Sequence, residues 1–180
     1  MKTRPYFRHS RSPGFSLVEL LVVILMIGIL MALAVVGTQY AMVKSRESKT
    51  QLQLELLKVG LEQYYRDNQA YPEATNPGHA RSDIMRNNRA LYQALSGDTL
   101  NNPRNPTGTV YLEELLAPGG SGSLQGLVRQ EGNNRVIVDA FDELINYMHP
   151  GMRNTTYDLW SYGRDISQNK EREELWITNW

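Results

Sequence analysis

The feature that most constrains this chain is an apolar run close to its N-terminus. From Leu20 to Val36, seventeen consecutive residues carry no charged or strongly polar side chain. Starting at Phe15 extends the run to 22 residues, broken only by Ser16 and Glu19. A helix rises about 1.5 Å per residue, so this run is long enough to cross the hydrocarbon core of a bilayer. We therefore predict a membrane-spanning helix over residues 15–37, which leaves less than the full 180 residues to build a globular core.

The order of charges, small residue and apolar run distinguishes this segment from a secretory signal peptide. The first 14 residues are basic and contain no acidic residue: Lys2, Arg4, Arg8 and Arg11. A signal peptide usually has an apolar region of about 7 to 15 residues with a small-residue cleavage site after it. Here Gly14 precedes the run, so cleavage at Gly14 would leave the apolar helix on the mature chain. The positive-inside rule keeps the basic leader (residues 1–14) in the cytoplasm and sends the rest across.

Charge and composition exclude several classes of function. The chain has 19 basic and 19 acidic residues, but without the four basic residues of the leader 15 remain against 19. An acidic body gives little support to nucleic-acid binding as a main role. The absence of cysteine excludes disulfides, thiolate metal sites and cysteine nucleophiles. The three histidines (His9, His79 and His149) lack metal-ligand spacing, and no serine, histidine and aspartate grouping stands out, so we predict no enzyme.

Glu19 is the one charged residue inside the apolar segment. A carboxylate within a membrane span costs about 2.5 to 3.5 kcal/mol on insertion scales, so it needs a compensating environment or a purpose. One interpretation is that Glu19 lies near the interface and reaches the lipid headgroups. The other is that it binds a positively charged partner.

The stretch around Glu19 carries a resemblance to a known family. Gly14-Phe15-Ser16-Leu17-Val18-Glu19-Leu20-Leu21-Val22-Val23-Ile24 resembles the cleavage and methylation signature of type IV prepilins and pseudopilins. The resemblance implies that a prepilin peptidase cuts between Gly14 and Phe15, that the new amino group of Phe15 is methylated, and that Glu19 assists subunit docking. The Phe15 ammonium of one subunit can neutralise Glu19 of a neighbour, which removes two costly charges together.

The helix is predicted to continue as an amphipathic segment over residues 38–70. After a gap of one heptad, residues at alternating steps of four and three form one stripe for core packing: Val43, Thr50, Leu54, Leu57, Leu61 and Tyr64. Polar residues occupy the other faces, among them Gln53. We expect the helix to end near Asn68, because Tyr71-Pro72 disfavours helix beyond it.

Residues 73–135 are predicted to be a variable, loop-rich insert with two short helical segments. The first starts after Ser82, buries Ile84, Leu91 and Leu95, and ends at Gly97. The second covers roughly residues 110–116. Residues 119–122 (Gly-Gly-Ser-Gly) lack the spacing of a phosphate-binding loop and are predicted to be a flexible surface loop.

Residues 136–180 favour strands, predicted at 136–138, 145–148, 157–162 and in a short segment ending at Trp180, with turns at Asp142-Glu143 and Pro150-Gly151. A meander of three or four antiparallel strands across the C-terminal half of the long helix would bury both apolar faces. The predicted fold is therefore α+β and type IV pilin-like, with residues 38–180 as the globular domain.

The C-terminal third resembles a narrower family. Residues 139–147, 150–151, 157–165 and 177–180 are similar to the major pseudopilin of type II secretion, so the resemblance covers residues 14–72 and 136–180 but not the insert. It implies a calcium site at the loop before the last strand. Asp165 falls on one implied ligand position, whereas Trp176 occupies the position of a second aspartate.

Calcium takes six to eight oxygen ligands, and four carboxylates are available in a rebuilt loop: Asp165, Glu171, Glu173 and Glu174. The alternative is a solvated acidic stretch paired with Lys170 and Arg172.

Together these features predict a structural subunit of a periplasmic pseudopilus that drives type II protein secretion. It would cross the bacterial inner membrane once, with the leader cytoplasmic and the body and filament periplasmic. The implied partners are further copies bound through the N-terminal helices, the prepilin peptidase, minor pseudopilins and the inner-membrane assembly platform. Two alternatives stay open: a pilin of a surface type IV pilus, used for adhesion, motility or DNA uptake, and a periplasmic binding or enzymatic domain with a membrane anchor.

Overall fold

The structure, a computed structural model, describes residues 14–75, 80–116, 126–165 and 172–180; the side chains of residues 34–37 are outside this description. Residues 1–13 of the basic leader, the predicted glycine-rich loop at 119–122 and Glu171 therefore lie outside the described residues. The chain divides into two compact units, Met1–Ala41 and Met42–Trp180, and each is described by itself.

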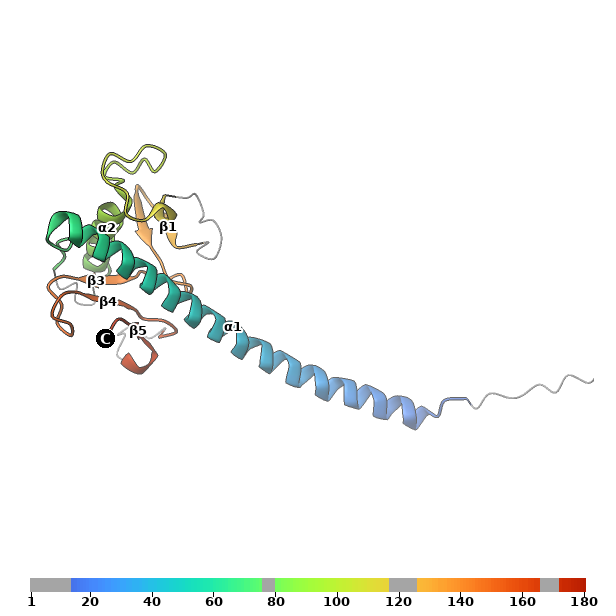
Figure 1. The fold of residues 1–180 in the computed structure, drawn as a ribbon. Coiled ribbons are helices and arrows are strands. Elements are labelled where there is room, and N and C mark those ends of the chain that lie inside the picture. The colour runs from blue at the N-terminus through green and yellow to red at the C-terminus, as the bar shows by residue number, and fades with distance from the viewer. Residues whose placement is uncertain (1–13, 76–79, 117–125, 166–171) are drawn as a thin grey trace, which may run out of the picture. The chain divides into compact units, whose positions relative to one another are not determined.

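Helix α1, Leu17–Asn68, is 52 residues long and begins and ends close to its predicted bounds (Figure 1). Its C-terminus is closed locally, since Gln69 adopts a left-handed φ of 55° and donates its backbone N–H to the Tyr65 carbonyl at 2.8 Å. Among the described residues, α1 is the one helix long and apolar enough to cross a membrane. In the first unit, all its described apolar side chains up to Leu33 are exposed.

In the second unit, α1 supplies one side of the hydrophobic core. The predicted stripe is confirmed: Thr50, Leu54, Leu57 and Leu61 are buried, and Val43 and Tyr64 are partly buried. Gln53 is also fully buried, so its assignment to a polar face was wrong. The buried arc is wider than the stripe because α2 and the loop before η1 cover it as well as the sheet. Gly60 permits one such contact, since a Cβ there would lie 2.7 Å from Leu112 Cδ1.

Helix α2, Arg81–Ser96, buries Ile84, Leu91 and Leu95 as predicted. It begins before Ser82, because the Ala80 carbonyl already accepts the backbone N–H groups of Asp83 and Ile84. Gly97 closes the helix with a φ of 66°, which confirms the predicted end. The second predicted helix is reduced to one 3-10 turn, η1, Glu113–Leu115.

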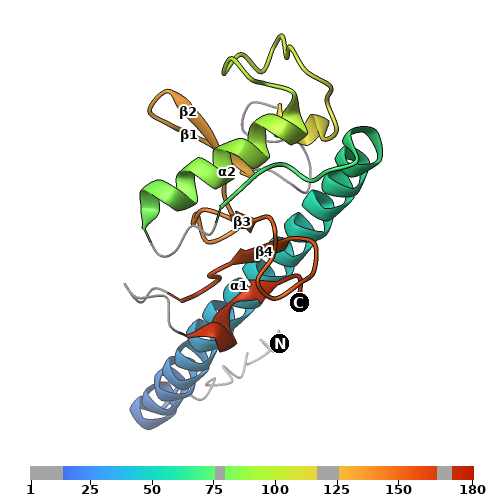
Figure 2. The same cartoon turned by 90° about the vertical axis from the view of Figure 1, so that its left-hand side faces the viewer.

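Within the described residues, five short strands form two antiparallel sheets rather than one meander (Figures 1 and 2). Strands β1, Val128–Glu131, and β2, Asn134–Ile137, form a hairpin. Strands β3, Asn146–Met148, β4, Asp158–Ser161, and β5, Ile177–Thr178, form the second sheet in the order β3-β4-β5. The predicted strand 136–138 is confirmed in part: Val136 and Ile137 pair with β1 across the Gly132-Asn133 turn, and Val138 forms an isolated antiparallel bridge with Leu144, just before β3.

The second sheet separates two clusters of buried side chains. Tyr147 and Leu159 belong to the larger cluster with the α1 stripe and the inner face of α2. Met148 and Trp160, their neighbours along the strands, belong to the smaller cluster with Ile84 and both Val136 and Val138. Successive side chains along β3 and β4 point to opposite faces of the sheet, so both faces are covered by buried residues.

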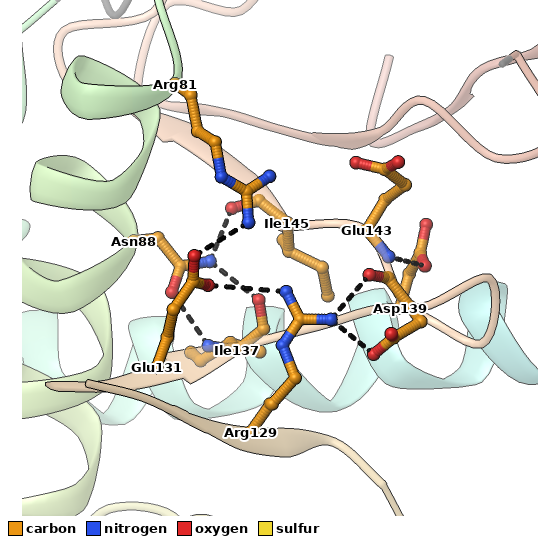
Figure 3. Close-up of polar contacts among 9 residues, drawn as sticks. Arg81, Asn88, Arg129, Glu131, Ile137, Asp139, Glu143 and Ile145 are labelled. Carbon is orange, nitrogen blue, oxygen red and sulfur yellow. Dashed lines mark hydrogen bonds and ion pairs between the residues drawn. The ribbon is translucent and has the colours of Figure 1, made fainter.

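One buried amide joins α2 to both sheets. The Asn88 side chain donates to the carbonyls of Ile137 and Ile145 at 2.7 Å each and accepts the Ile137 N–H at 2.7 Å (Figure 3). Figure 3 also shows Arg81 and Arg129 on either side of Glu131, at 2.8 and 3.3 Å. The hydrogen bond from Arg81 is the main reason that the pKa of Glu131 is lowered. These contacts attach the hairpin to the helix.

We predict that Asn88→Ala lowers the free energy of unfolding by about 3 kcal/mol, because it leaves two buried carbonyls and one buried N–H without partners. The measurement is chemical denaturation of the full chain in detergent micelles. Gln93→Ala is the control, since Gln93 makes one exposed hydrogen bond from the same helix, to the Thr99 carbonyl at 3.2 Å. Equal losses in the two variants would contradict a special role for Asn88.

Candidate processing and assembly site

The predicted scissile bond lies in exposed, non-helical chain just before α1. Gly14, Phe15 and Ser16 precede the first helical residue, Leu17. The Phe15 side chain is 77 % exposed, and a Cβ added at Gly14 would meet nothing within 4 Å. A protease binds its substrate as extended chain, so both sides of this peptide bond are accessible to an enzyme.

Glu19 and Ser16 form a capping box at the start of α1. The Glu19 Oε2 atom accepts the Ser16 backbone N–H at 2.9 Å, and the Ser16 Oγ atom accepts the Val18 backbone N–H at 3.3 Å. The first helical bond follows, from the Leu20 N–H to the Ser16 carbonyl at 3.2 Å. These contacts satisfy backbone donors that a helix leaves open at its first turn.

The sequence analysis missed this cap, although its signal is present. Serine followed three residues later by glutamate, directly before an apolar run, is the pattern of a capping box. The cap gives Glu19 a role within its own chain in addition to the predicted docking role.

The cap also places the Glu19 carboxylate where cleavage would create a charge. Ser16, whose N–H it accepts, is the next residue after Phe15, whose nitrogen would become the new amino terminus. A carboxylate at a helix N-terminus is further favoured by the helix dipole. Glu19 is therefore positioned for an ammonium group, from its own chain or from another.

The surface beside the cap is entirely apolar. Five side chains line a shallow groove there: Leu17, Leu20, Leu21, Ile24 and Leu25. A face of this kind offers shape and apolar area to another helix or to lipid, and no group for chemistry.

The residues predicted to bind calcium lie in separate contacts. Asp165 is 1 % exposed and accepts the Arg172 backbone N–H at 3.1 Å and the Trp176 indole N–H at 3.4 Å. Glu173 pairs with Arg153 at 3.1 Å, and Glu174 pairs with Arg172 at 3.2 Å. In the part of the chain that the structure describes, no three acidic, histidine or cysteine side chains gather to hold a metal ion. These donors do not fit a calcium site, and the calcium prediction stays untested.

Two further buried carboxylates hold turns of the C-terminal domain, and the sequence analysis did not single them out. Asp158 accepts the backbone N–H groups of three consecutive residues, Met152 to Asn154, at 2.6 to 2.8 Å. Asp139 accepts the N–H groups of Phe141 and Glu143 and the Ser161 hydroxyl. Burial raises the pKa of Asp139. These carboxylates take donors from the backbone and neighbouring side chains, which indicates a structural role.

Comparison with known proteins gives two family matches. Residues 9–35 match the prokaryotic N-terminal methylation motif, and residues 76–180 match type II secretion system (T2SS), protein G. The searches of curated proteins and of solved structures found no match. Both matched families are structural rather than enzymatic. The second match includes residues 76–135, so the sequence analysis was wrong to leave this segment outside the resemblance.

We predict that Ser16→Ala frays the first turn of α1, because it removes the acceptor for the Val18 N–H, at a cost of about 1 kcal/mol. Hydrogen exchange at residues 17–20, measured by mass spectrometry in detergent micelles, should become about fivefold faster. Glu19→Gln keeps an acceptor oxygen and should show a smaller increase. Unchanged exchange in Ser16→Ala would contradict the cap.

Proposed function

The chain belongs to the type II secretion system protein G family, and from this premise we propose that it is a structural subunit of a periplasmic pseudopilus that drives type II protein secretion. The observation that carries the proposal is the exposed apolar stretch of α1, residues 17–33, whose one charged residue, Glu19, lies beside a predicted cleavage point. The match to protein G favours this role over the surface pilus, and a structural family disfavours an anchored binding or enzymatic domain.

The exposed apolar face of α1 requires two successive environments. The large apolar side chains between Phe15 and Leu33 are each 41 to 81 % exposed. Contiguous apolar surface of this extent is rare on soluble monomeric proteins. A bilayer covers them before assembly. Copies of the same helix cover them afterwards, in a filament that grows from the inner membrane into the periplasm.

Glu19 favours the transfer of the helix from the bilayer to the filament, because its carboxylate can pair with the ammonium group of a neighbouring subunit. In the capped helix its carboxylate already accepts one N–H, from Ser16. After cleavage, the Phe15 ammonium of the same chain and that of a neighbour compete for the remaining acceptor positions. In the low dielectric of the membrane, docking is favoured when every Phe15 ammonium and every Glu19 carboxylate has a partner of opposite charge. A neighbour that brings its own ammonium and carboxylate satisfies this condition.

The remaining partners follow from this assignment. The prepilin peptidase would remove the cytoplasmic leader, residues 1–14, and the new amino group of Phe15 would be methylated. The other proposed partners are minor pseudopilins and the inner-membrane assembly platform. The globular domain, residues 38–180, stays on the periplasmic side.

We predict that Glu19→Ala abolishes filament assembly while cleavage continues. Assembly is measured in secreting cells by electron microscopy and by crosslinks between copies; cleavage is measured by the mass of the protein. The matched control is Glu55→Ala, which removes an exposed carboxylate of the same helix that pairs with Lys58 at 2.9 Å. Normal filaments in Glu19→Ala would show that docking does not use this carboxylate.

Processing gives an independent prediction. Protein recovered from membranes that contain the peptidase should have the mass of residues 15–180 plus one methyl group. Replacement of Gly14 by valine should leave the leader attached, because a branched side chain obstructs a cleft that binds bare, extended backbone. An intact Met1 on the unaltered protein from such membranes would contradict the proposed function as a whole.

A further inference from the structure

Asp165 joins two parts of the chain that are separate in sequence. It follows β4 directly through the turn at Gly163, where its own N–H donates to the Tyr162 carbonyl at 3.0 Å. Its carboxylate then accepts N–H groups of Arg172 and Trp176 at 3.1 and 3.4 Å, beyond the segment 166–171 that lies outside the described residues. The carboxylate thus holds the start of the C-terminal segment 172–180 against the end of β4.

That segment has little other backbone support at its start. Strand β5 pairs with β4 over two residue pairs, Trp160 with Thr178 and Ser161 with Ile177. Trp176 directly precedes the strand and packs edge-on against Tyr162, with ring centroids 5.0 Å apart. At the far end of the strand, Asn179 exchanges two hydrogen bonds with Leu159, at 2.9 and 3.1 Å, so the contacts of Trp176 fix the near end of the last strand.

The geometry at Asp165 is suited to N–H donors. Both bonds end on the same oxygen, Oδ2, and two donors occupy the two lone pairs of a carboxylate oxygen. The N–H groups also present their positive ends to Oδ2, which disfavours a cation on that oxygen. The nearby carboxylates of Glu173 and Glu174 are engaged by Arg153 and Arg172.

We propose that the Trp176 indole takes the place of a bound cation at Asp165, so that the C-terminal segment is fastened by protein donors and folds without calcium. Trp176 stands where the resemblance implied a second calcium-binding aspartate, and here the residues at the two positions bind each other. The proposal does not rest on the pseudopilus function.

The test measures the thermal unfolding midpoint (Tm) of the full chain in detergent micelles. Near-ultraviolet circular dichroism is the signal that reports unfolding. With millimolar calcium or with excess chelator, the unaltered protein should give the same Tm to within about 1 °C, since no folded-state site would be filled. Trp176→Phe keeps a ring against Tyr162 but removes the N–H donor. It should lower Tm by about 3 °C in both conditions.

Two comparisons make the test specific. Trp180→Phe makes the same exchange at a 44 % exposed indole that contacts Trp160 rather than Asp165, and should lower Tm less than Trp176→Phe. Asp165→Asn keeps an oxygen that can accept an N–H and should lower Tm less than Asp165→Ala. An increase of several degrees in the Tm of the unaltered protein with calcium would overturn the proposal. So would equal losses in the two tryptophan variants. The comparison with and without calcium uses the unaltered protein, so it tests the proposal even if Asp165→Ala does not fold.

Discussion

The structure depends on one helix that must satisfy two different surroundings. Over its first turns α1 exposes nearly every side chain, and these are apolar. Over its later turns it buries a stripe from Thr50 to Leu61 in a protein core. Water suits only the second part, since exposed apolar area on the scale of the first is unfavourable in solution. That surface needs an apolar cover, such as a bilayer or another apolar helix.

Four carboxylates of the described residues, three buried and one exposed, bind the backbone in the same way. Glu19, Asp139, Asp158 and Asp165 each accept at least one backbone N–H group. Such bonds compensate for lost hydration and at the same time fix the local backbone, because each donor belongs to a particular turn. In the C-terminal domain these acidic residues replace regular secondary structure as the means of ordering loops. The acidity of the body therefore reflects how its turns are built as well as its surface.

Local signals in the sequence were sufficient for the two long helices, α1 and α2, but not for residues 110–116, where only the 3-10 turn η1 forms. The apolar stripe and Pro72 located the end of α1, and Gly97 located the end of α2, because these signals act within a few residues. The hairpin β1-β2 was missed since Val128-Arg-Gln-Glu131 has only one apolar residue, and its stability comes from Arg81 and from Asn88 on α2. Gln53 and Asn88 were placed wrongly or overlooked for the same reason. Asn88 is buried with hydrogen bonds to residues 49 or more positions away, which no local pattern records. Gln53 is buried although its amide has no hydrogen-bond partner among the described residues.

The acidic residues near the C-terminus show most clearly why spacing alone did not define a site. A run of carboxylates suggests a cation, but the structure directs Glu173 to Arg153, twenty residues earlier, and gives Asp165 an indole partner. The Asp165 and Glu19 carboxylates differ in how exposed they are to solvent. Glu19 lies on an exposed surface, so its hydrogen bond to Ser16 can be exchanged for a stronger partner at little cost. Asp165 is almost completely buried, and to break its bonds to Arg172 and Trp176 would remove compensation from a buried charge. The same chemical group thus serves as an exchangeable contact at one end of the chain and as a permanent fastening at the other.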